Sequence, residues 1–148
     1  MEVGDRLELG RLVKAYAHHV DRREPDAVAA LFCEDGVLAI YEGDPDVVAP
    51  DRVRTGRAEI ATALAGMSRY EVTTHFLGQQ MVDVDGDAAT GETYCMAHHI
   101  SEVDGARRDK VMAIRYLDRY RRVGGEWKIE ERRLAVDWTD DRELPPRG

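Results

Sequence analysis

The sequence predicts an α+β fold, a cone in which three N-terminal helices pack inside a curved, mostly antiparallel sheet. Two observations predict it. Apolar residues recur at helical spacing before residue 70, and four long segments rich in β-branched and aromatic residues follow from Tyr70 onward. With 148 residues, 43% of them hydrophobic, the chain can bury one core, so we expect a single domain.

Three helices are expected before the long strands. The first carries an apolar stripe at steps of three, four and seven, formed by Leu9, Leu12, Val13, Tyr16 and Val20. A second, short helix is expected in PDAVAALF, with Pro25 in its first turn and an end near Glu34-Asp35-Gly36. VLAIY is then a short strand, and EGDPDVVAPD, with two prolines, is an excursion at the surface. The third helix is expected in RAEIATALAGM, where one stripe holds Ile60, Leu64 and Met67.

Four strands are expected after residue 70, in YEVTTHFLGQQMVDV, ATGETYCMAHHISEV, KVMAIRYLDRYRRV and EWKIEERRLAVDW. Glycine-containing turns join them at Asp85-Gly86-Asp87, Asp104-Gly105 and Gly124-Gly125. The strands therefore form an antiparallel meander, with a pocket expected at the open end of the sheet. We expect the tail, about residues 139–148, to be loose or to form a lid.

Charge and composition exclude several classes of function. The net charge of -8 opposes binding to nucleic acids and to anionic membrane surfaces, so the expected ligand is small and weakly charged. No apolar run approaches the roughly 20 residues of a membrane span, and the first residues lack signal-peptide features, so we expect a cytoplasmic protein. The adjacent pairs His18-His19 and His98-His99 are poorly spaced for chelation, so we expect no metal.

Four strings carry a resemblance to a known family. In order they are YAHHVDRREPDAVAALFCEDGVL, TGRAEI, TTHFLGQQ and RYLDRYRRVGGEWKIEERR. Together they resemble the SnoaL-like branch of the nuclear transport factor 2-like superfamily, which includes scytalone dehydratase, ketosteroid isomerase and polyketide cyclases. The resemblance covers nearly the whole chain, so it implies one SnoaL-like domain over residues 1–148 with the cone-shaped fold.

The resemblance implies a catalytic pair. Asp21 in HHVDRR and His75 in TTHFLG match the aspartate and the histidine base of bile-acid dehydratases and hexachlorocyclohexane dehydrochlorinase. Tyr16 matches a tyrosine of the dehydratases, and Arg132 corresponds to a dehydrochlorinase arginine that helps hold the leaving group. Without the resemblance, a lone histidine in an apolar strand is more often structural, and Tyr16 on its apolar stripe is more often core.

Strand alternation gives the expected lining of the pocket. It places one set of side chains on a common face, and by analogy with the dehydrochlorinase this face lines the cavity: Thr93, Cys95, Ala97 and His99. Trp127 and Ile129 should face away from Arg132, as core or as a subunit contact. Apolar residues on the outer face of the sheet predict a homodimer or homotrimer.

The leading functional prediction is a cofactor-independent lyase of the dehydratase type, acting on a small hydrophobic substrate. His75 is the general base, Asp21 orients it, and Tyr16 or Arg132 stabilises the developing negative charge or the leaving group. An isomerase or polyketide-cyclase-type proton transfer uses the same base. A different class remains open, namely a non-catalytic scaffold like the small subunit of ring-hydroxylating dioxygenases, or a ligand-binding protein.

Overall fold

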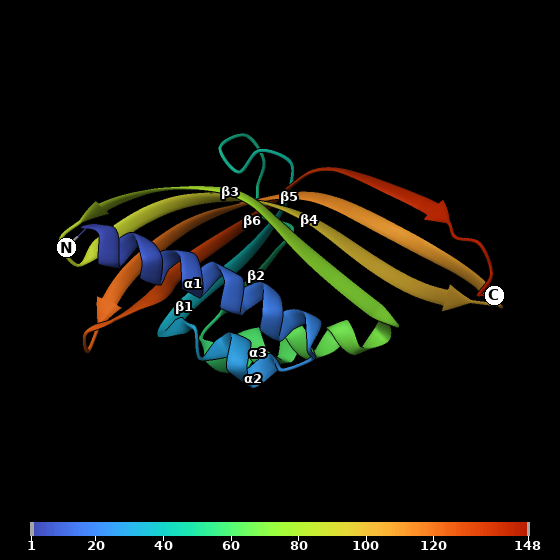
Figure 1. Ribbon diagram of the computed structural model, residues 1–148, viewed down its shortest axis with the longest axis horizontal. Coiled ribbons are helices and arrows are strands. Elements are labelled where there is room, and N and C mark those ends of the chain that lie inside the picture. Colours follow the sequence, from blue (N-terminus) through green and yellow to red (C-terminus); the bar gives the residue numbers. More distant parts are fainter. Residues whose placement is uncertain (1, 148) are drawn as a thin grey trace.

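The structure, a computed structural model, describes residues 2–147. Its helices lie together on one side of a single curved sheet (Figure 1). The elements follow the chain in this order: α1 Glu2–Asp21, α2 Pro25–Ala29, β1 Phe32–Glu42, β2 Arg52–Thr55, α3 Arg57–Ala65, the 3-10 helix η1 Gly66–Arg69, β3 Val72–Asp85, β4 Ala88–Val103, β5 Ala106–Val123 and β6 Glu126–Glu143. Among the described residues, no helix is long and apolar enough to cross a membrane.

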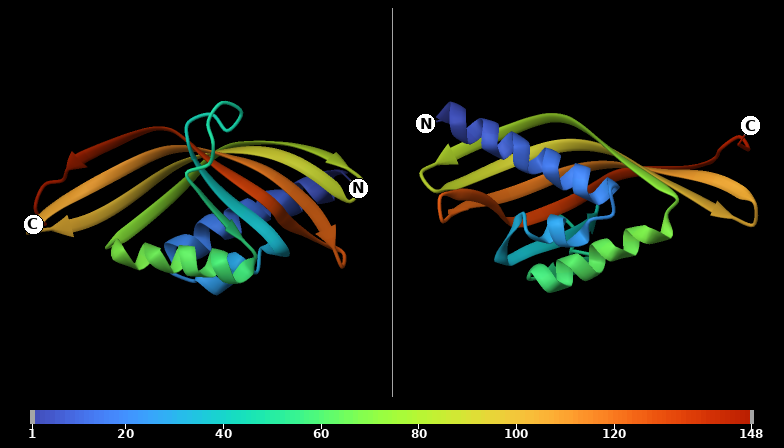
Figure 2. Two further views of the ribbon diagram at one scale, coloured as in Figure 1. Left: turned by 180° about the vertical axis from the view of Figure 1, so that it is seen from behind. Right: turned by 60° about the horizontal axis from the view of Figure 1, so that its bottom comes forward.

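The sheet has six strands in the order β2-β1-β6-β5-β4-β3. Strands β3 to β6 form the expected antiparallel meander, β2 pairs antiparallel with β1, and β1 pairs parallel with β6. The sheet bends over the helices, so its concave side faces them and its convex side faces away (Figure 2). The predicted α+β cone is therefore confirmed.

The core lies between the helices and the concave side of the sheet. The apolar stripe expected on the first helix is its buried face, and each of its members is at most 7% exposed: Leu9, Leu12, Val13, Tyr16 and Val20. Val28, Phe32, Ile60 and Leu64 add buried side chains from α2, β1 and α3. Helical spacing in the sequence thus gave the inward face of α1 correctly.

The segment after α2 differs from the expectation. The second helix ends at Ala29, and Gly36, expected near the helix end, lies within β1. A Cβ at Gly36 would come within 2.9 Å of the carbonyl oxygen of Cys33 and of the Phe32 side chain. Glycine is therefore needed there for close backbone packing in a strand, where the β1–β6 register also shifts between Phe32 and Val37.

Two further segments differ. The excursion before residue 52 is a loop that projects beyond the convex side of the sheet (Figure 1), but it returns as the short edge strand β2, which the sequence did not predict. Residues 139–143, expected in a loose tail or lid, form the end of β6. They extend the sheet because β5 is long enough to pair with them, from Met112 opposite Thr139 to Arg108 opposite Glu143.

The expected orientation of Trp127 and Ile129 is wrong. Both are core residues, 4% and 0% exposed, and they lie on the same side of the sheet as the fully buried Arg132. The cause is one extra residue, Glu130, because Tyr120 pairs with Ile129 whereas Arg119 pairs with Glu131. This bulge reverses the alternation along β6. Because Trp127 and Ile129 are buried in the core, they do not support a homodimer or homotrimer, and the homo-oligomer stays a prediction.

Candidate active site

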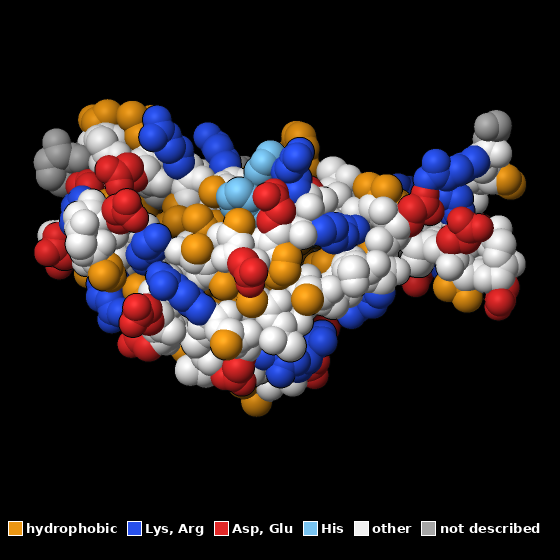
Figure 3. Space-filling view, turned by 90° about the horizontal axis from the view of Figure 1, so that it is seen from below, with side chains coloured by type: hydrophobic (Ala, Val, Ile, Leu, Met, Phe, Trp, Pro, Cys, Tyr) orange, Lys and Arg blue, Asp and Glu red, His pale blue; other side chains and the backbone are white. Residues whose placement is uncertain are grey.

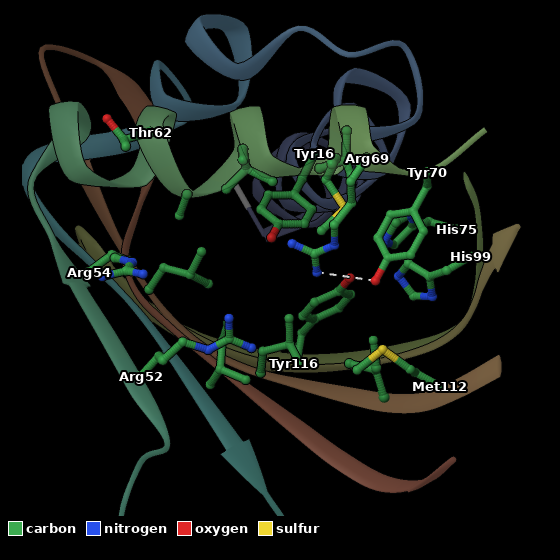
Figure 4. A pocket seen from close by; sticks show the side chains of 18 of the residues that line it. Tyr16, Arg52, Arg54, Thr62, Arg69, Tyr70, His75, His99, Met112 and Tyr116 are labelled. Atoms are coloured by element: carbon green, nitrogen blue, oxygen red, sulfur yellow. Dashed lines mark hydrogen bonds between the residues drawn. The ribbon is translucent and has the colours of Figure 1, made fainter. Parts of the chain in front are cut away.

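A cavity of about 620 Å³ opens between the concave side of the sheet and the helices. Side chains from α1, α3, η1 and all six strands line it, and many of them are apolar. Its principal polar groups near the β3–β4 side are Tyr16, Tyr70, His75, His99 and Tyr116 (Figure 4).

Asp21 and His75 meet at the wall of this cavity. Asp21 is the last residue of α1, and its Oδ1 lies 2.7 Å from Nδ1 of His75 in β3. Its Oδ2 accepts the backbone N–H of His75 at 2.9 Å, and the Thr73 hydroxyl donates to Oδ1 at 3.0 Å. The structure therefore brings together the two residues that the resemblance paired.

These contacts keep Asp21 ionised. Partial burial raises the pKa of the Asp21 carboxyl, but the hydrogen bonds from the side chain and backbone of His75 outweigh burial and hold the pKa below its usual value. A carboxylate only accepts hydrogen bonds, so Nδ1 of His75 carries the proton. In the neutral ring, Nε2 is then an acceptor, and His75, with a side chain only 7% exposed, lines the cavity.

Arg23 contacts the pair through Thr73 and was not among the expected site residues. Its Nη1 donates to the Thr73 hydroxyl at 2.8 Å, which leaves the Thr73 proton to donate to Asp21. Its Nη2 donates to the carbonyl oxygen of Tyr70 at 3.2 Å, so one guanidinium joins the end of α1 to the start of β3. The only sequence signal was the basic Arg22-Arg23 step directly after Asp21.

Of the four residues expected to line the pocket, His99 does so. Its Nδ1 lies 3.0 Å from the carbonyl oxygen of Lys110, to which it donates, and its ring stands edge-on to the His75 ring at 5.9 Å. Thr93, Cys95 and Ala97 share the concave face but are at most 1% exposed and lie outside the cavity lining. Cys95 and Ala97 pack in the core with α1, and burial raises the pKa of the Cys95 thiol to about 11.

The stability of the protein should depend on pH through His99. Burial lowers the pKa of His99 below its usual value. The unfolded chain therefore binds more protons than the folded one as pH falls below about 6.5, and stability falls with it. We expect His99→Asn, whose amide can still donate to the Lys110 carbonyl, to show a smaller loss of unfolding free energy between about pH 7 and about pH 5 than the wild type. Urea denaturation measures this, with the exposed His18→Asn as control; equal losses in His99→Asn and wild type would contradict it.

Arg132 does not take the position expected from the resemblance. It is fully buried and lies outside the cavity lining, where its Nε and Nη2 donate to Asp118 at 2.9 and 2.8 Å. Its guanidinium lies over the rings of Tyr16 and Tyr116, at 4.1 and 3.8 Å from their centroids. The buried carboxylate of Asp118 holds Arg132 beneath these tyrosines, away from a leaving group in the cavity.

The two tyrosines, unlike Arg132, do line the cavity. Burial raises the pKa of both phenols, so each hydroxyl remains protonated and can donate a hydrogen bond. Tyr16 was expected here. Tyr116, whose strand face also holds the buried Asp118 and Tyr120, was not among the expected site residues.

A group of possible metal ligands lies elsewhere, at the end of α1. Ligand atoms of His18, His19 and Glu24 come within 4.8 Å of one another. The same Glu24 oxygen already lies 3.3 Å from His19 Nδ1 and 3.4 Å from Arg22 Nε. The arginine competes with a cation for this carboxylate, and the absence of a metal stays a prediction.

Three helices inside a curved sheet, around a cavity with an aspartate–histidine pair, define a cone-shaped α+β protein with a candidate active site. The chain belongs to the SnoaL-like domain family, of the nuclear transport factor 2-like superfamily, whose family model matches residues 1–133. The resemblance inferred from the four strings is thereby confirmed.

Solved structures agree with this assignment. The chain is similar to a proposed scytalone dehydratase from Novosphingobium aromaticivorans, at 26% identity and a TM-score of 0.82, over 99% of this chain and 95% of that one. It shares its fold with a type 2 hexachlorocyclohexane dehydrochlorinase (18% identity, TM-score 0.81, 99% and 95% covered). The β subunit of a proposed aromatic-ring-hydroxylating dioxygenase from N. aromaticivorans also shares the fold, at 18% identity and a TM-score of 0.77, over 93% of this chain and 92% of that one.

Proposed function

We propose that the protein is a cofactor-independent lyase that eliminates water from a small substrate with an acidic C–H bond. The observation that carries the proposal is the 2.7 Å contact between Asp21 and His75 at the wall of the cavity. A carboxylate on Nδ1 leaves Nε2 able to take a proton from carbon. The similarity to a proposed scytalone dehydratase supports elimination of water as the reaction.

The proposed reaction begins with a β-hydroxy carbonyl compound in the cavity. Nε2 of His75 removes the α-proton, and the electron pair of the C–H bond moves to the carbonyl oxygen. Asp21 stabilises the imidazolium, and the Tyr16 hydroxyl donates to the enolate oxygen. The enolate then forms the C=C bond as the β-carbon–oxygen bond breaks, and the imidazolium returns its proton to the departing hydroxide. One water leaves, and His75 is neutral again.

His99 has a supporting part in this proposal. Because its Nδ1 donates to a backbone carbonyl and burial lowers its pKa, its Nε2 is an acceptor at neutral pH. It can therefore hold the β-hydroxyl of the substrate by accepting its hydrogen bond, close to the His75 ring.

The experiment uses 4-hydroxy-4-phenylbutan-2-one and its para-carboxyphenyl analogue. Ultraviolet absorbance follows the conjugated enone that forms when water leaves, and NMR in D2O follows deuterium uptake at the α-carbon. The proposal expects both signals from the wild-type protein on at least one of the two compounds. Deuterium uptake without enone would instead favour an isomerase or cyclase-type proton transfer. If neither enone formation nor deuterium uptake is observed, the result would favour the scaffold or ligand-binding alternative.

A further inference from the structure

We propose that the substrate is an amphiphilic carboxylate, whose anionic group binds Arg52 and Arg54 at the end of the cavity away from His75. The inference deepens the proposed function by naming the substrate class of the same cavity. It departs from the expectation of a weakly charged ligand, which rested on the net charge of the whole chain.

The charges around the cavity differ in sign from the charge of the chain. Its charged lining consists of four cations and two carboxylates, an excess of two positive charges, in a chain with a net charge of -8: Arg52, Arg54, Arg69, Lys110, Glu42 and Glu59. The helix side of the molecule otherwise carries both signs, with Asp and Glu side chains among the Lys and Arg (Figure 3). A local excess of positive charge at a cavity raises the local concentration of anions.

Most of these cations have no carboxylate partner. Among residues 2–147, Arg54, Arg69 and Lys110 form no ion pair within 4.0 Å, and Arg52 makes only a 3.8 Å contact with Asp51. Arginines on the strands away from the cavity are held more closely, as in the contact of 2.9 Å from Arg115 to Asp137. The cations at the cavity can therefore pair with a ligand.

Among residues 2–147, Glu59 forms no ion pair with these cations. Its Oε2 accepts the backbone N–H of Thr55 at 3.1 Å, so this carboxylate is engaged at the junction of β2 and α3. Glu42 is the other carboxylate of the lining, at the end of β1. The carboxylate oxygens of Glu42 lie more than 4.0 Å from the guanidinium nitrogens of Arg52 and Arg54, so Glu42 forms no ion pair with either arginine.

The arrangement gives the cavity two different ends. Arg52 and Arg54 are two residues apart on β2, so their side chains leave the same face of the strand. In Figure 4 they lie on one side of the cavity, whereas His75 and His99 lie on the other. Apolar side chains lie in the lining between these ends, including Leu38, Ile40 and Leu134.

This arrangement orients a substrate of matching shape. Two guanidinium groups can hold a carboxylate through parallel N–H donors. An apolar body would then fill the middle of the cavity, and the reacting carbon would lie toward His75. A substrate that bound the other way round would bring its carboxylate beside Asp21, where two like charges repel.

Arg69 lies between the two ends. Its Nη2 donates to the Tyr70 hydroxyl at 3.1 Å, and its guanidinium lies 4.8 Å from the centre of the Tyr70 ring. This contact holds Arg69 toward the middle of the cavity (Figure 4), so it adds positive potential there without belonging to the proposed carboxylate site.

The test compares 2-naphthoate with 2-naphthamide, which has nearly the same shape and no charge. Isothermal titration calorimetry at neutral pH should give the wild type about tenfold or more tighter binding of the carboxylate. The double variant Arg52→Gln/Arg54→Gln should lose most of this difference and keep its affinity for the amide. Arg119→Gln, which removes a cation outside the cavity lining, should keep the difference.

Two results would overturn the inference: equal binding of both compounds by the wild type, or a difference that survives in the double variant. The His75→Ala variant separates this test from that of the proposed function, since it should retain the preference for the carboxylate. The two proposals can therefore fail separately. If the preference for the carboxylate depends on Arg52 and Arg54 but the reaction does not need His75, the anion site is supported and the dehydratase mechanism is rejected.

Discussion

His75→Ala is expected to lower the rate of enone formation by about 10²–10⁴-fold, because the variant lacks the base that removes the α-proton. Initial rates measure this, with circular dichroism to show that the fold is kept. His98→Ala is a matched control. His98 Nδ1 also lies 2.7 Å from a carboxylate, that of Asp109, but His98 points to the opposite face of β4 from His99. Equal losses in both variants, or no loss in His75→Ala, would contradict the assignment.

Asp21→Asn, measured in the same way, should also lower the rate of enone formation by about 10²-fold or more. The backbone N–H of His75 requires an acceptor at 2.9 Å and so selects the amide oxygen. The amide NH2 then points at Nδ1, and the imidazole moves its own proton to Nε2. The ring is held in place but is no longer a base toward the cavity. Affinity for 2-naphthoate should change little.

Arg132→Met is expected to lower the free energy of unfolding by about 3–5 kcal/mol, because it leaves the Asp118 carboxylate buried without its partner. Both side chains of this pair are 0% exposed. Urea denaturation measures the loss. In Arg132→Met/Asp118→Asn the buried charge is gone and the Tyr120 hydroxyl keeps an acceptor, so part of the stability should return. A loss below about 1 kcal/mol in the single variant would mean that Arg132 is not the buried anchor described above.

Much of the fold could be predicted from local patterns. The stripe on α1 is buried as expected, and the expected turns contain Gly86, Gly105 and Gly124, all with positive φ. The predictions were wrong or incomplete where hydrogen-bond pairing between strands determines the structure. A bulge at Glu130 depends on the register between β5 and β6, and no residue type in EWKIEERR marks it. The edge strand β2 has four residues, too few for a pattern.

The candidate site was predicted less completely. Asp21 and His75 are 54 residues apart, and only the family resemblance paired them. Arg23 and Thr73 reach the pair through contacts that span 50 and 52 residues, which spacing cannot reveal. Alternation along β4 gave the correct face, but Cys95 and Ala97 are buried in the core, whereas His99 lies at the cavity.

The proposed reaction requires that Asp21 fixes the proton of His75 on Nδ1 and leaves Nε2 as a base toward the cavity. Long-range ¹H–¹⁵N correlation NMR of histidine-labelled protein at mildly alkaline pH observes this directly. We expect a protonated Nδ1 and an unprotonated Nε2 for His75 in the wild type, and the reverse in Asp21→Asn. A wild-type His75 with its proton on Nε2 would contradict the claim, because no base would then face the substrate.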